Sequence, residues 1–155
     1  MKLTIVSGRS GSGKTVALRV LEDLGYYCVD NLPLPLLPDL IKSLTGNYDA
    51  VAVSIDVRNL PLDPSELHQT IHSLKSLVDL TTLFLDASSS ILVRRYSETR
   101  RLHPLAKMQL SLSQAIDQET ALLEPISESA DLRIDTSDMS IHDLCELVKQ
   151  RVLGQ

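Results

Sequence analysis

The chain of 155 residues has few aromatic side chains: no tryptophan, one phenylalanine and four tyrosines. Aliphatic residues must therefore build its core, and a share of 43% hydrophobic and 23% charged residues is typical of a globular domain. The scarcity of aromatic rings also argues against a surface that stacks the bases of single-stranded nucleic acid. A chain of this length is normally a single domain.

Cysteine is equally scarce. The two copies, Cys28 and Cys145, form no CxxC or Cys/His spacing, so the sequence predicts neither a metal site nor a disulfide framework. An excess of basic residues is also missing, because the formal net charge is −5, and this argues against general binding to nucleic acid. The sequence contains no recognisable signal peptide and no apolar run as long as a membrane span. We therefore expect a cytoplasmic protein without a membrane partner.

Five short apolar runs alternate with helical patterns along the chain. The runs are rich in β-branched residues and largely unalternated, as in strands that are buried on both faces. Strands that alternate with helices predict a parallel, doubly wound sheet. The expected strands are residues 3–6, 26–29, 50–55, 82–85 and 132–134, and helices are expected from residue 14, after residue 31, and from residues 63, 111 and 140.

The clearest motif lies between the first expected strand and the first expected helix. Residues 8–15 match the P-loop pattern G-x-x-x-x-G-K-[ST] at each fixed position. Glycines let several backbone N–H groups point at one anion, and the helix N-terminus adds partial positive charge. Lys14 is expected to reach the β- and γ-phosphates of ATP or GTP, and the Thr15 hydroxyl to ligate Mg²⁺. The predicted nucleotide contacts of this motif are Gly8, Arg9, Ser10, Gly11, Ser12, Gly13, Lys14 and Thr15.

A P-loop also predicts the fold and a second acidic element. The expected architecture is α/β: a three-layer P-loop NTPase or kinase-like fold with a five-stranded parallel sheet. An acid at the end of a neighbouring strand should hold the metal's water shell. Asp56, after the third strand, is the favoured metal-side and catalytic acid beside the P-loop lysine, and Asp86, after the fourth, is the alternative. Either could instead be a helix cap or a surface acid. Val57, Arg58 and Asn59 follow at the ligand-binding edge of the sheet and join the predicted nucleotide site.

A basic cluster follows the fourth strand and consists of Arg94, Arg95, Arg100 and Arg101. In small-molecule and nucleotide kinases, an arginine-bearing lid lies at this point in the order of elements and closes over the transferred phosphate. The cluster is therefore a candidate lid. A solvated basic helix and a contact to RNA phosphates are the alternatives that the pattern leaves open.

The motifs leave three functions open. The chain is a regulatory nucleotide-binding module with weak NTPase activity, a small-molecule or nucleotide kinase, or a scaffold whose nucleotide serves only folding. A kinase needs an acceptor beside the γ-phosphate, and Asp30 lies at the right strand edge, but the sequence names no acceptor. The guanine motif [NT]-K-x-D does not occur, so the sequence does not choose between ATP and GTP.

Four segments together strongly resemble the RNase adapter protein RapZ family, and the resemblance covers essentially the whole chain. Two of them contain runs that are not general P-loop features, D-N-L-P from Asp30 and R-Y-S-E-T-R-R from Arg95. The segments are residues 6–15, 27–33, 54–59 and 94–105. The resemblance implies a cytoplasmic bacterial protein that binds and slowly hydrolyses ATP and GTP. It also implies that residues 56–59 form a second nucleotide-binding motif, described for GTP.

The resemblance further implies an adapter role. In enteric relatives the protein presents a small regulatory RNA to the endoribonuclease RNase E, which tunes amino-sugar synthesis. Family members continue into a C-terminal domain that is held to bind RNA. Residues 1–155 are accordingly expected to be the P-loop domain, the N-terminal half of a longer two-domain protein. Because this half is acidic and has no evident catalytic Gln or Glu after the P-loop, we expect slow hydrolysis and weak RNA binding by it alone. A homo-oligomer is left open.

Overall fold

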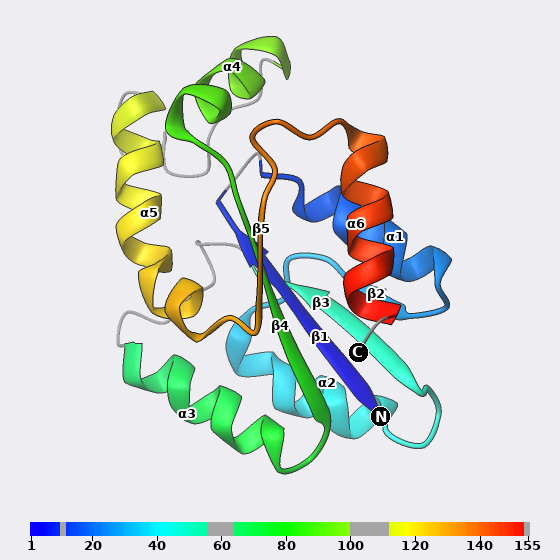
Figure 1. The fold of residues 1–155 in the computed structure, drawn as a ribbon. Coiled ribbons are helices and arrows are strands. Elements are labelled where there is room, and N and C mark those ends of the chain that lie inside the picture. Colours follow the sequence, from blue (N-terminus) through cyan, green and yellow to red (C-terminus); the bar gives the residue numbers. More distant parts are fainter. Residues whose placement is uncertain (10–11, 56–63, 100–111, 154–155) are drawn as a thin grey trace.

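The computed structural model describes residues 1–9, 12–55, 64–99 and 112–153 (Figure 1). One sheet runs through this part of the chain, in the order β2-β3-β1-β4-β5, and each neighbouring pair of strands is parallel. The strand that leads into the P-loop is therefore the central one. The strands are β1 (Lys2–Gly8), β2 (Tyr27–Val29), β3 (Ala50–Ser54), β4 (Asp79–Asp86) and β5 (Leu132–Asp135). The predicted α/β architecture with a five-stranded parallel sheet is confirmed.

Helices cover both faces of this sheet and make the fold a three-layer one. In Figure 1, α1 and α6 lie together on one side, and α2, α3 and α5 lie on the other. The helical segments are α1 (Lys14–Asp23), the short 3₁₀ turn η1 (Leu34–Leu36), α2 (Leu37–Leu44), α3 (Pro64–Lys75), α4 (Ser89–Thr99), α5 (Leu112–Ser129) and α6 (Ile141–Leu153). Among these described helices, none has the length and apolar character that crossing a membrane requires.

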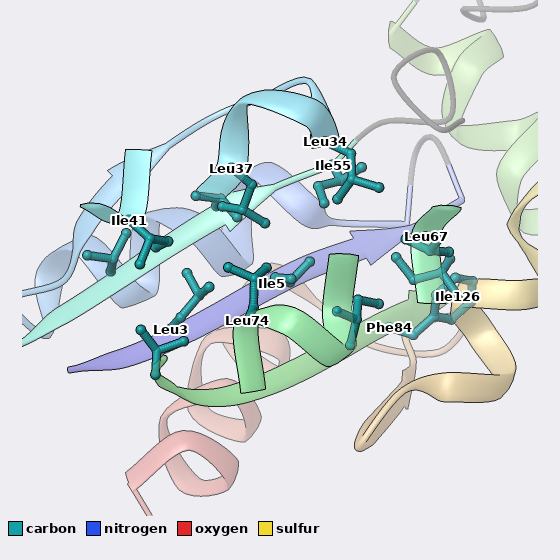
Figure 2. Close-up of a cluster of buried hydrophobic side chains, with 14 of the residues drawn as sticks. Leu3, Ile5, Leu34, Leu37, Ile41, Ile55, Leu67, Leu74, Phe84 and Ile126 are labelled. Atoms are coloured by element: carbon teal, nitrogen blue, oxygen red, sulfur yellow. The ribbon is translucent and has the colours of Figure 1, made fainter. Parts of the chain in front are cut away.

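Two buried layers explain why the strand sequences are apolar without alternation. On one face, Leu3 and Ile5 of β1 pack against side chains of α2, α3 and α5 (Figure 2). On the other face, Val6 packs with α1 and α6. Successive side chains of β1 thus enter opposite cores, and both kinds of position must be apolar.

Two of the expected strands begin earlier in the structure than the apolar runs predict. The apolar runs predict residues 3–6 and 82–85, whereas β1 begins at Lys2 and β4 begins at Asp79, which is paired with it. The hydrogen bonds between neighbouring strands use backbone groups alone, so polar residues such as Thr81 can belong to a strand. The apolar pattern of the sequence does not reveal that such residues are part of it.

The helix ends follow local signals closely. Gly25, which follows the last turn of α1, has φ +97°, and its N–H donates to Glu22 O while that of Tyr26 donates to Leu21 O, both at 3.0 Å. This is a Schellman motif, which satisfies carbonyls at the end of the helix. Ahead of α6, Ser140 and Asp143 each accept the other's backbone N–H, at 3.1 and 3.2 Å, and this reciprocal pair caps the helix that was expected from residue 140.

Candidate functional site

The P-loop connects the carboxyl end of the central strand to the N-terminus of α1. Gly8, with φ +154°, has no room for a side chain, because a Cβ there would lie 2.3 Å from the carbonyl oxygen of Leu85. Gly13, with φ +112°, is similarly close to α6, since a Cβ would lie 2.7 Å from Cδ2 of Leu144. The two fixed glycines therefore let the loop pack closely between β4 and α6 as well as curl.

Lys14 folds back across this loop. Its Nζ donates to the Gly8 carbonyl at 3.2 Å, which joins the last part of the motif to its first residue. Within the described part of the chain, the ammonium has no carboxylate partner. The first turn of α1 carries no acidic residue, and no side chain caps its N-terminus. Positive charge from the lysine and from the helix dipole is thus concentrated beside the exposed Thr15.

Arg9 lies against β4. Its residue surface is 6% exposed, and Nη1 donates to Asp86 Oδ1 at 3.3 Å and to the Ala87 carbonyl at 2.9 Å. Its backbone N–H donates to Leu85 O at 3.3 Å. The residue was predicted as a nucleotide contact, and the structure places its side chain as a tether between the loop and the end of β4.

The Asp86 carboxylate therefore already has hydrogen-bond donors. Its Oδ1 accepts hydrogen bonds from the Arg9 guanidinium and, at 2.7 Å, from the N–H of Ala87. An aspartate that neutralises a buried arginine is a weaker candidate for a metal's water shell than one without such a partner. The predicted first choice, Asp56, lies outside the described residues, together with Val57, Arg58 and Asn59.

The described arginines of the candidate lid are Arg94, which is exposed on α4, and Arg95. Arg95 donates to the Thr136 hydroxyl at 3.1 Å and to the Thr136 carbonyl at 2.6 Å, so it connects α4 to the end of β5. Arg100 and Arg101 lie outside the described residues, as do Ser10 and Gly11 of the P-loop.

Thr136, directly after β5, contacts the P-loop although it belongs to none of the motifs. Its hydroxyl donates to the Ser12 carbonyl of the P-loop at 2.7 Å across 124 positions of sequence. No local pattern reports such a contact, and the one available signal was a polar residue directly after a strand that ends at the ligand-binding edge. Beside it, hydrogen bonds from the side chain and the backbone of Ser137 lower the pKa of Asp135, and the charge of Arg95 acts in the same direction.

A second polar group lies at the same edge of the sheet, two strands from β1. Asp30 follows β2 and its Oδ1 accepts a hydrogen bond from the Ser54 hydroxyl at the end of β3. That hydroxyl also accepts the N–H of Asn31 at 2.7 Å, and Asn31 has φ +54°. The Asn31 N–H thus orients the Ser54 hydroxyl, which in turn holds the exposed Asp30 carboxylate at this edge.

The opposite edge of the sheet carries a shallow groove of about 190 Å³, where β1 and β4 begin. Its lining residues are Lys2, Thr4, Tyr26, Asp79, Thr81 and Val152. The described residues contain no group of three or more His, Cys, Asp or Glu side chains that could hold a metal by themselves.

Solved structures define the class of fold. The chain is similar to the YorR protein from Bacillus subtilis in complex with phosphorylated GDP, with a TM-score of 0.67 and 17% identity over 97% of this chain and 95% of that one. It is similar to shikimate kinase from Acinetobacter baumannii in complex with shikimate, with a TM-score of 0.64 and 17% identity over 98% and 93%. At these identities the likeness shows the fold alone, and that fold is the P-loop kinase-like one.

Sequence comparison defines the family. The whole chain, residues 1–155, matches the RapZ-like N-terminal domain. It is 61% identical to a nucleotide-binding protein from Aeromonas hydrophila over 100% of this chain and 54% of that protein. It is also 61% identical to one from Pseudoalteromonas atlantica over 100% of this chain and 55% of that protein. The chain belongs to the RapZ-like N-terminal domain family, and it spans about half the length of these relatives.

Proposed function

We propose that the chain binds ATP or GTP with Mg²⁺ at residues 8–15. The observation that carries the proposal is the complete P-loop at the end of the central strand, with Lys14 folded onto Gly8. The names of the relatives, nucleotide-binding proteins, support it. A phosphate would replace the neutral carbonyl acceptor of Lys14 by an anionic one, which adds the attraction between opposite charges to the hydrogen bond.

The proposed roles follow from position. Lys14 would contact the β- and γ-phosphates, and backbone N–H groups of residues 8–15 would surround them. Thr15 and Asp56 would hold the Mg²⁺ side, and residues 56–59 would form a second part of the nucleotide site. When bound, Mg²⁺ would neutralise charge on the phosphate oxygens. Arg9 and Asp86 would keep the loop in place through the hydrogen bond between them.

Hydrolysis by this site is proposed to be slow. Phosphoryl transfer to water needs a positioned nucleophile and a cation on the γ-phosphate. Lys14 supplies positive charge, but Arg95, one of the candidate lid cations, is bound to Thr136. Regulation by nucleotide occupancy therefore fits the site better than rapid turnover.

For the longer protein we propose a cytoplasmic adapter that presents a small regulatory RNA to RNase E and so controls amino-sugar synthesis. The support for this role is membership of the RapZ-like family. The net charge of −5 favours an RNA site mainly outside the present chain.

A small-molecule or nucleotide kinase is the second candidate, and Asp30 favours it. Its carboxylate is held by Ser54 at the edge where an acceptor would approach the γ-phosphate. Such a carboxylate can orient an acceptor hydroxyl or accept its proton.

The test is a calorimetric titration of the chain with ATP, GTP and their diphosphates in excess Mg²⁺, followed by single-turnover assays with and without candidate acceptors. We expect saturable binding of at least one triphosphate and slow release of phosphate to water. Transfer to an acceptor that Asp30→Asn abolishes would favour the kinase. Absence of binding to all four nucleotides would contradict the proposed function.

A further inference from the structure

A chain of hydrogen bonds runs from α4 through the end of β5 to the P-loop. Thr136 is 2% exposed, and its hydroxyl donates to the Ser12 carbonyl at 2.7 Å. Nη1 of Arg95 donates to that hydroxyl at 3.1 Å, and Nη2 donates to the Thr136 carbonyl at 2.6 Å. The guanidinium therefore holds the side chain and the backbone of the threonine together.

The distances decide where the single hydroxyl proton of Thr136 goes. Oγ1 lies 2.7 Å from Ser12 O and 3.2 Å from Asp86 O, so the bond to the P-loop is the stronger one. The charged donor Arg95 polarises the hydroxyl and strengthens its donation. Because the N–H of Thr136 donates to Asp86 O at 2.7 Å, the residue is also fixed to β4.

The direction of the Ser12 carbonyl has a consequence for the next amide. In a planar trans peptide unit, the C=O of one residue and the N–H of the following residue point in opposite directions. The Ser12 carbonyl points at Thr136, so the Gly13 N–H points away from the end of β5. Backbone N–H groups turned to a common side are what makes a P-loop an anion cradle.

We propose that Thr136, held by Arg95, is a positioning residue that fixes the Ser12–Gly13 peptide unit so that the Gly13 N–H faces a nucleotide phosphate. This inference rests on the proposed nucleotide site. It gives Arg95 a role distinct from that of a lid, because the guanidinium acts on the loop through Thr136. It also connects α4 to the phosphate site through two side chains.

Matched variants isolate the hydroxyl. Thr136→Val replaces it by a methyl group of similar size, and Thr136→Ser keeps it. The control is Thr82→Val, because Thr82 is also buried, at 3% exposure, and its hydroxyl bonds to Asp131 at the other end of β5. In calorimetric titrations with ATP and GTP in excess Mg²⁺, we expect Thr136→Val to weaken binding about fivefold to tenfold, the range of one net hydrogen bond. Thr136→Ser and Thr82→Val should remain within about twofold of the wild type.

A double-mutant cycle tests the connection to α4. Arg95→Ala alone should weaken binding about threefold, and it should add little in the Thr136→Val background, because both changes break one chain of contacts. If Thr136→Val does not fold, the other two variants still test the inference, because Arg95→Ala is expected to weaken binding and Thr136→Ser is not.

A second measurement does not need a nucleotide. In ¹H–¹⁵N spectra of the unliganded chain, the Gly13 amide resonance should move in Thr136→Val and Arg95→Ala but not in Thr136→Ser or Thr82→Val. Wild-type affinity and an unmoved Gly13 resonance in Thr136→Val would overturn the inference and leave the proposed function standing. Equal weakening by Thr136→Val and Thr82→Val would overturn it as well, by showing general destabilisation. A wild-type chain that binds neither triphosphate would overturn the proposed function and this inference together.

Discussion

A buried threonine joins each end of β5 to β4, but the two threonines differ in which other segments they contact. Before the strand, Asp131 and Thr82 bond to each other: Asp131 Oδ2 accepts the Thr82 N–H at 2.9 Å, and the Asp131 N–H donates to Thr82 Oγ1 at 2.9 Å. After the strand, Thr136 contacts the P-loop, α4 and β4. The first arrangement holds the sheet together, and the second joins the sheet to the segments that carry the candidate chemistry.

The largest effect should come from the P-loop itself. Lys14→Ala removes the ammonium that we propose contacts the phosphates, and we expect triphosphate affinity to fall by about 100-fold or more, since a charged hydrogen-bonding partner is lost. Calorimetric titration measures the loss, and thermal unfolding should show an intact fold. Lys149→Ala is the matched control, because the Lys149 side chain lies on α6, outside the P-loop, and is 43% exposed. Wild-type affinity in a folded Lys14→Ala chain would refute the P-loop as the nucleotide site.

Substitution of Asp131, directly before β5, should lower stability without affecting nucleotide binding. Asp131→Ala leaves the N–H and hydroxyl of buried Thr82 without this acceptor, and we expect a loss of about 1–2 kcal/mol in unfolding free energy. Urea denaturation measures it, with Asp117→Ala on the exposed side of α5 as the control. If Asp131→Ala changed nucleotide affinity by more than about twofold, the proposed difference between the two ends of β5 would be wrong.

The two candidate acids for the metal side, Asp56 and Asp86, should differ in how much their substitution slows hydrolysis. Asp56→Asn is expected to slow Mg²⁺-dependent hydrolysis about tenfold while nucleotide binding changes less. Asp86→Asn weakens the pairing with Arg9, so it should lower stability by about 0.5–1 kcal/mol and leave hydrolysis nearly unchanged. Phosphate release under single-turnover conditions measures the rates. The reverse pattern would transfer the metal-side role to Asp86.

The effect with the least bearing on nucleotide binding concerns Cys28 on β2, which lies at the other side of the sheet from β5. Burial, with a contribution from the charge of Glu22, raises the pKa of the Cys28 thiol from 9.0 to about 11. At pH 8 we expect iodoacetamide to alkylate it roughly 100-fold more slowly than an ordinary thiol, because the thiolate is the reactive form. The native state keeps this proton above pH 9, so its contribution to stability falls as pH rises from about 9 to about 11. A Cys145→Ser background isolates the thiol, and rapid alkylation of the folded chain at pH 8 would contradict the assignment.

Local patterns account for most of the fold. The apolar runs located all five strands, and the helix expected from residue 140 begins at Ile141, because burial on two faces and helix capping are encoded within a few neighbouring residues. The extension of β4 to Asp79 was missed, since its pairing with β1 uses backbone groups that leave no trace in the side-chain pattern.

The candidate site was predicted less completely. The P-loop motif identified its own segment, but not the partners that hold it. Arg9 reaches Asp86 and Thr136 reaches Ser12 across 77 and 124 positions, and such contacts exist only once the sheet has brought the strand ends together. The sequence offered Arg95 as part of a candidate lid and did not indicate its contact with Thr136, because that partner is distant in sequence.

The most direct test of the account is a titration of the ¹⁵N-labelled chain with ATP and GTP in excess Mg²⁺, followed by ¹H–¹⁵N spectra. The central claim is that nucleotide binds at the edge where the strands end. We predict that the largest shifts fall on Gly8, Gly13, Lys14, Thr15 and Thr136, while Thr82 and Asp131 stay unchanged. Shifts centred on the groove beside Tyr26, or no shifts at saturating nucleotide, would contradict that claim.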